Sequence, residues 1–119
     1  MEAPPVQYTT TTDGVSIAWA EAGHGPPLLY CGPTPFTHVQ EQVAVLEASF
    51  GAFTRSFRLV TFDARGTGMS EREVADVSTA TLLMDAEAVI DAAKLDRLIV
   101  MASPNILATS TCLRLATTF

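Results

Sequence analysis

The sequence predicts an α/β fold in which helices cover both faces of a mostly parallel sheet. Three short apolar runs, at 28–31, 59–62 and 98–101, lack the regular alternation of half-exposed strands, as is typical of strands buried on both faces. Stretches with apolar residues at helical spacing separate these runs, so strands and helices alternate along the chain. The 119 residues are 48% hydrophobic and 17% charged, which indicates one globular domain at most.

A hairpin is predicted before the first apolar run. Residues 6–11 and 15–21 are strand-like, and Asp13-Gly14 between them is typical of a tight turn whose two central residues both need positive φ. Residues 1–5 are expected to be a loose leader, and residues 6–119 to form one incomplete domain.

Helices are predicted after each apolar run. Ser78 is a suitable N-cap for the second of them, and Ser103-Pro104 begins a third. The residues at helical spacing are Val39, Val43, Leu46, Phe50 and Phe53 in the first helix and Leu82, Ala86, Val89 and Ala93 in the second.

The corner after the second apolar run reads Asp63-Ala64-Arg65-Gly66-Thr67-Gly68-Met69-Ser70. Its two glycines allow the chain to leave the strand through positive φ angles. The pattern Asp-x-Arg-Gly-x-Gly-x-Ser resembles the corner after the fourth strand of α/β-hydrolases. The similarity is greatest to the proline-iminopeptidase and epoxide-hydrolase branch and to hydrolase-like domains linked to bacterial regulators and cyclases.

The resemblance extends over roughly residues 6–103 and implies a partial α/β-hydrolase sheet that is truncated after the position of the nucleophile. In that family the corner shapes the floor beneath the active site and does not attack the substrate. The resemblance therefore gives a structural role to five residues, which are Asp63, Arg65, Gly66, Gly68 and Ser70.

Ser103 occupies the position of the family's nucleophile, which follows the fifth strand in a Gly-x-Ser-x-Gly turn. Gly32 and Thr34, in the loop after the third strand, are the candidate oxyanion donors. Pro104 has no N–H, although the oxyanion hole takes one from the residue after the nucleophile. Losing one such donor costs on the order of 10²–10³ in rate.

The acid and the base of a catalytic triad are absent downstream of Ser103. No Asp, Glu or His follows it in the sequence, and the histidines His24 and His38 both precede it. His24 is expected to be exposed in a loop, and His38 to have a packing or capping role. A serine without a base has an unactivated hydroxyl, so a helix cap is the favoured interpretation of Ser103 over a working nucleophile.

These features predict the N-terminal segment of a serine-hydrolase-like protein, inactive by itself. A truncated gene, a frameshift or a partial assembly would each produce such a segment. The resemblance implies that the intact parent acts on an ester, an amide or a similar small-molecule substrate without a cofactor. Two alternatives stay open: a non-catalytic binding or dimerising module, and an enzyme completed by an acid and a histidine from another chain.

Charge and composition restrict the partners. The formal net charge of −6 argues against nucleic acid and anionic membranes. No apolar run is long enough to span a bilayer and the start does not resemble a signal peptide, so the predicted location is cytoplasmic. The resemblance to domains linked to bacterial regulators implies a bacterial protein. Cys31 and Cys112 match no metal-ligand spacing and are expected to be reduced thiols, so no metal is predicted.

Two expectations concern individual surfaces. Three carboxylates, Asp63, Asp85 and Glu87, are expected to be fold-supporting or solvated rather than catalytic. Residues 98–101 would lie at an open sheet edge if no further strand followed, which predicts possible self-association through that strand.

Overall fold

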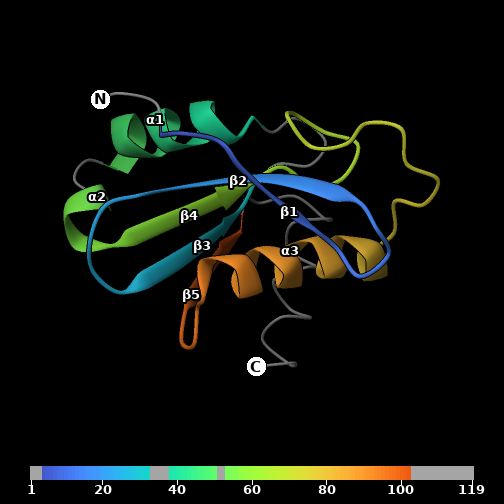
Figure 1. Ribbon diagram of the computed structural model, residues 1–119. Coiled ribbons are helices and arrows are strands. Elements are labelled where there is room, and N and C mark those ends of the chain that lie inside the picture. The colour runs from blue at the N-terminus through green and yellow to red at the C-terminus, as the bar shows by residue number, and fades with distance from the viewer. Residues whose placement is uncertain (1–3, 33–37, 51–52, 103–119) are drawn as a thin grey trace.

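The computed structural model describes residues 4–32, 38–50 and 53–102, which form a sheet with helices on both sides (Figure 1). Helix α1 lies over one face of the sheet and α3 over the other. No helix in these ranges is long and apolar enough to cross a membrane. The elements are β1 (Gln7–Thr10), β2 (Ser16–Ala22), β3 (Pro27–Cys31), α1 (Val39–Phe50), α2 (Phe53–Ser56), β4 (Arg58–Phe62), α3 (Thr79–Ala93) and β5 (Ile99–Ala102).

The five described strands form one mixed sheet in the order β1-β2-β4-β3-β5. The β1–β2 and β2–β4 pairs are antiparallel, whereas β4–β3 and β3–β5 are parallel. Each parallel connection passes through a helix, α1 between β3 and β4 and α3 between β4 and β5. This arrangement confirms the predicted hairpin followed by parallel strands with helices on both faces.

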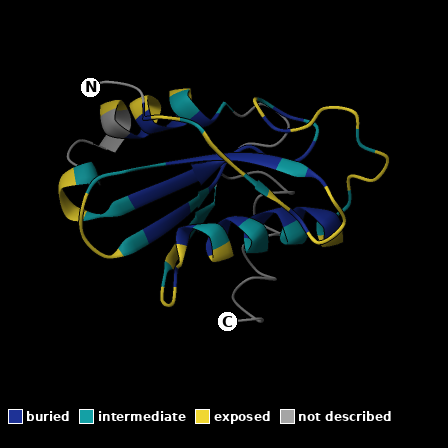
Figure 2. Cartoon of the chain, viewed as in Figure 1, coloured by how far each residue is buried: buried dark blue, intermediate teal, exposed yellow. Residues whose placement is uncertain are grey.

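The face of the sheet toward α3 carries the larger core. Leu29, Val60 and Phe62 pack there in one cluster with Ala86 and Val89 of α3. Because successive strand residues point to opposite faces, their neighbours along the strands belong to the other core. Figure 2 shows the resulting band of buried residues through the centre of the sheet.

The opposite face packs against α1. Leu28 and Leu59 form a second cluster with Val43 and Leu46, all of them buried. The continuous apolar character of β3 and β4 therefore follows from burial on both faces, as the sequence predicted.

Helix α3 begins and ends at identifiable caps. The Ser78 hydroxyl accepts a hydrogen bond from the Thr81 N–H, and the Thr81 hydroxyl accepts one from the Ser78 N–H, which forms a capping box. Lys94 ends the helix in a left-handed conformation, with φ of 57°. The predicted N-cap and the predicted buried stripe of this helix are both confirmed.

The predicted geometry of the hairpin turn is wrong. Gly14 has φ of 86°, but Asp13 is not among the described residues with positive φ. Instead, the Gly14 N–H donates to the Thr11 carbonyl at 3.0 Å, and the Thr11 N–H donates to the Val15 carbonyl at 2.9 Å. The turn is therefore a three-residue loop, a common alternative in which only the last residue takes positive φ. The Thr11 hydroxyl favours it by accepting from the Val15 N–H at 2.9 Å.

Two predicted boundaries also need correction. The first helix does not continue to residue 53, because α1 ends at Phe50 and α2 is a separate short helix. The loop after β2 packs closely on α2, and its Gly23 has no room for a Cβ, which would lie 2.5 Å from the Thr54 carbonyl oxygen. The last strand begins at Ile99, one residue later than predicted.

Candidate functional site

The corner after β4 is built from short local hydrogen bonds. The Thr67 N–H and hydroxyl both donate to the Ala64 carbonyl, at 3.1 and 2.7 Å. Gly66 and Gly68 have φ of 79° and 50°, as the sequence predicted. The chain can therefore turn sharply at the end of the sheet while most of the corner stays buried.

Asp63 connects this corner to the beginning of α1. Its side chain is completely buried, and its Oδ2 atom accepts from the Val39 N–H at 3.1 Å and from the Met69 N–H at 2.8 Å. The Val39 N–H is one of the helix-terminal donors that lack an intrahelical partner. Asp63 therefore fixes the position of α1 relative to the ends of the parallel strands.

Ser70 connects the corner to β2. Its hydroxyl accepts from the Ala18 N–H at 2.8 Å and donates to the Asp63 carbonyl. Next to it, the Glu71 N–H donates to the Ser16 carbonyl at 2.9 Å. The residues after the corner therefore extend the hydrogen bonding of β2 beyond its pairing with β4.

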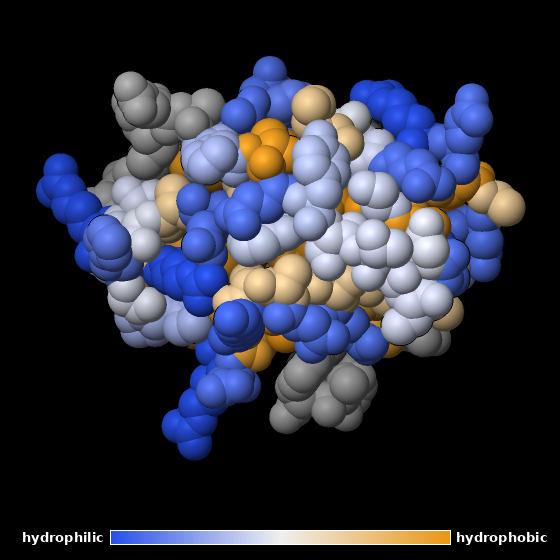
Figure 3. Space-filling view, in the orientation of Figure 1, coloured by the Kyte–Doolittle hydropathy of each residue, from blue (hydrophilic) through white to orange (hydrophobic). Residues whose placement is uncertain are grey.

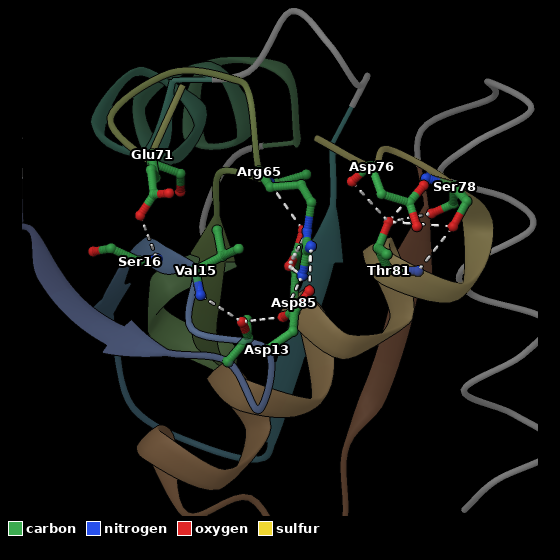
Figure 4. A network of polar contacts seen from close by, with 12 residues as sticks. Asp13, Val15, Ser16, Arg65, Glu71, Asp76, Ser78, Thr81 and Asp85 are labelled. Atoms are coloured by element: carbon green, nitrogen blue, oxygen red, sulfur yellow. Dashed lines mark hydrogen bonds and ion pairs between the residues drawn. The ribbon is translucent and has the colours of Figure 1, made fainter. Parts of the chain in front are cut away.

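Arg65 occupies the centre of a charged cluster that joins three elements (Figure 4). Its Nε donates to Asp85 Oδ1 at 2.9 Å, and its backbone N–H donates to Asp85 Oδ2 at 2.9 Å. Its Nη1 and Nη2 donate to the two carboxylate oxygens of Asp13, at 2.7 and 3.0 Å. The side chains of Arg65 and Asp85 are 2% and 0% exposed, whereas that of Asp13 is 37% exposed.

The two carboxylates respond differently to this arrangement. Hydrogen bonds from Arg65 hold the pKa of Asp13 well below its usual range. Burial raises the pKa of Asp85, because the loss of solvation outweighs the stabilisation by Arg65. Hydrogen bonding to Asp13 raises the pKa of Arg65, which stays charged at all ordinary pH values.

Asp13 should therefore give the fold an acid-dependent contribution. Because its folded-state pKa lies below the usual value of 3.8, its stabilisation is present above that pH and is lost as the pH falls below it. We expect Asp13→Asn to lower the urea midpoint at neutral pH, and expect this difference to shrink progressively below pH 3.8. Urea titrations of both proteins across this range measure the effect. A difference that is constant with pH would contradict the role of Asp13.

The carboxyl ends of β3 and β4 meet at the first turn of α1. Gly32 follows β3 and is buried, and a Cβ there would lie 2.5 Å from the side chain of Gln42. Asp63 follows β4 at the same edge of the sheet. The predicted Thr34 and Ser103, with Pro104 and the predicted last helix, lie outside the described residues, as does Cys112.

Two buried polar atoms at this edge have no hydrogen-bond partner, a feature that the sequence did not indicate. They are Oδ1 of Asp63 and Nδ1 of His38. The His38 carbonyl accepts from the Gln42 N–H at 3.0 Å, which places His38 at the start of α1 in a capping position. His24 is exposed, as predicted. Within the described ranges, no group of three His, Cys, Asp or Glu residues could hold a metal ion.

Solved structures with the same fold are numerous, although no family model and no curated protein matches the sequence. An α/β-hydrolase fold protein from Burkholderia ambifaria is 28% identical, with a TM-score of 0.75 over 95% of this chain. A hydrolase from Pseudomonas aeruginosa is 26% identical, with a TM-score of 0.79 over 97%. A variant of an epoxide hydrolase from Vigna radiata is 25% identical, with a TM-score of 0.73 over 99%.

The chain spans well under half of these neighbours. It covers 39%, 42% and 36% of their respective chains. The similarity therefore concerns one part of a larger fold.

Proposed function

Because the chain has the fold of the first part of an α/β hydrolase, we propose that it is the N-terminal segment of a serine-hydrolase-like protein. The carboxyl ends of β3, β4 and β5 form the edge at which the substrate of the complete protein would bind. In open α/β sheets, ligands bind where the chain order reverses, and here β4 and β5 lie on opposite sides of β3. The substrate class is a small ester, amide or related hydrolysable compound.

The observation that carries this proposal is that the Asp63 side chain connects the corner to the start of α1. The Asp63 carboxylate holds the first turn of α1 beside Gly32, which is where the family places its oxyanion loop. Ser103, the next residue in the sequence after the end of β5, is the candidate nucleophile. Because β3 and β4 are parallel, Gly32 and Asp63, which directly follow them, lie at a common edge of the sheet.

The 119 residues by themselves are expected to have no serine-hydrolase activity. Pro104 cannot supply an oxyanion N–H, and no acid or histidine follows Ser103 in the sequence. We expect no labelling by a fluorophosphonate probe and no hydrolysis of a short-chain aryl ester above the background rate. Labelling that Ser103→Ala abolishes would show that Ser103 is an activated nucleophile, contrary to this expectation.

A second candidate function is a dimerising module, which the exposure of β5 favours. Ile99 is 48% exposed, and among the described strands only β3 pairs with β5. An apolar edge strand offers its free N–H and C=O groups to another chain. The proposed partner is a second copy of this chain.

Ile99→Lys is therefore expected to shift the chain from dimers or larger species toward monomers. Lysine in an edge strand opposes pairing because the charge must be desolvated. Light scattering coupled to size exclusion measures this shift, and Val77→Lys, at another exposed apolar position, is the matched control. A monodisperse monomer before any substitution would contradict the dimerising function.

A further inference from the structure

A groove lies between the outer edge of β1 and the flank of α3. Its volume is about 360 Å³, at the small end of the range for ligand sites. Threonines of β1 and of the hairpin turn, among them Thr10 and Thr12, line one side, and α3 lines the other. Figure 3 shows this face directly, as a pale-orange strip between near-white residues above and blue residues below.

The groove exists because α3 carries short side chains at this position. The buried stripe of α3 packs on the sheet, and Ala88 and Ala92, one turn apart, lie beside that stripe on the flank. A methyl group cannot fill the space that a leucine would occupy. The floor of the groove is therefore apolar and shallow, and both of these residues are partly exposed.

The outer edge of β1, beside the groove, has free backbone groups. The backbone groups of Ser16 and Ala18 in β2 form hydrogen bonds with the corner and with Glu71 directly after it, on the side away from β1. In an antiparallel pair, facing residues alternate between exchanging both hydrogen bonds and exchanging none. The residues that face Ser16 and Ala18 are Thr10 and Tyr8. The N–H and C=O groups of these two residues consequently point outward, and Tyr8 is 56% exposed.

The opposite wall of the groove is acidic. Glu87 and Asp91, one turn apart on α3, line it, and no lysine, arginine or histidine does so. Neither carboxylate forms an ion pair with a described residue. A partner that carries positive charge would therefore find two unpaired carboxylates at a distance of one helical turn.

We propose that this groove binds an extended basic peptide segment. The segment adds to the edge of β1 through the outward N–H and C=O groups of Tyr8 and Thr10. Its lysine or arginine side chains on one face then lie over Glu87 and Asp91. Main-chain hydrogen bonds supply affinity in this mode of recognition, and alternate side chains supply specificity. None of the residues that line this surface directly follows β3, β4 or β5, and binding there does not depend on hydrolase chemistry.

The test uses the full chain and two short fluorescein-labelled peptides, one alternating threonine with lysine and the other threonine with glutamate. Fluorescence anisotropy should show binding of the lysine peptide and at least about tenfold weaker binding of the glutamate peptide. Raising the salt concentration should weaken binding of the lysine peptide, because the ion pairs are partly exposed. Equal binding of both peptides, or no binding of the lysine peptide, would overturn the proposal.

Variants separate the features that the proposal combines. Glu87→Gln with Asp91→Asn should weaken binding by about three- to tenfold, whereas the control Glu73→Gln with Asp76→Asn should leave it within about twofold. Ala88→Leu should reduce binding by filling the floor, with the chain still folded by circular dichroism. If neutralising Glu87 and Asp91 weakens peptide binding no more than the control does, these carboxylates do not bind the peptide and the proposal is wrong. Self-pairing of the chain that Thr10→Pro abolishes, without peptide binding, would identify a second copy as the occupant instead.

Discussion

Replacing Arg65 by leucine is expected to lower the free energy of unfolding by about 3–5 kcal/mol, because it leaves the carboxylate of Asp85 buried without its counterion. Asp85 is completely buried and receives three of its contacts from Arg65. The measurement is equilibrium unfolding in urea. The matched control is Arg97→Leu, which removes an exposed arginine without an ion pair to any described residue and should change stability by less than about 0.5 kcal/mol.

A double variant distinguishes the buried charge from the packing of the long side chain. Arg65→Leu combined with Asp85→Leu removes both charges, so it should be more stable than Arg65→Leu alone. If the double variant is as unstable as the sum of the two single variants, the pair is not coupled. A loss below about 1 kcal/mol for Arg65→Leu would show that the charged cluster is not a major support of the corner.

Gly68→Ala is expected to destabilise the chain by about 3 kcal/mol or more, from two separate causes. Gly68 has φ of 50°, a conformation that costs a residue with a Cβ about 1–2 kcal/mol. In addition, the new Cβ would lie 2.1 Å from Oδ2 of Asp63, the atom that accepts from Val39 and Met69. Moving this carboxylate would break buried hydrogen bonds.

Two other glycines provide controls for the backbone term. Gly14 and Gly66 have φ of 86° and 79°, but a Cβ on Gly14 would meet nothing within 4 Å, and one on Gly66 would be 3.5 Å from Val74. Alanine at either position should therefore cost only about 1–2 kcal/mol. Urea midpoints of the three variants compare the two causes. Equal losses at all three positions would show that the contact with Asp63 has no consequence.

The sequence predicted best those features that depend on neighbours along the chain. Ser78 was recognisable as an N-cap because serine is among the preferred N-cap residues and stands just before the apolar stripe of α3. The buried stripe of α3 was recognisable because its residues recur at the spacing of one helical face. The positive φ angles of the corner were predictable because glycine adopts them far more readily than residues with a Cβ.

Features that depend on distant partners were harder to predict. Asp85 lies in a helix, where a carboxylate is usually solvated, and only the folded chain brings it to Arg65. By its local conformational preference alone, Asp13-Gly14 favours a two-residue turn. Here Arg65, far away in the sequence, binds the side chain of Asp13, and the structure has a three-residue loop. The site was predictable only through its resemblance to a known corner, because the spacing of residues contains no catalytic triad.

The strand order has a consequence for how the chain folds. Among the described strands, only β1 and β2 are paired and also joined by a short turn. Strand β2 pairs in addition with β4, and β3 with β5, and both of these partners come much later in the sequence. Contacts between residues far apart in sequence slow folding, because the intervening chain must be closed before they form. During synthesis, the apolar strands β2 and β3 emerge before either of their later partners exists. Refolding is therefore expected to be slower than that of a helical domain of equal length. Until their partners pair with them, β2 and β3 expose apolar surface and free edges, which favours aggregation.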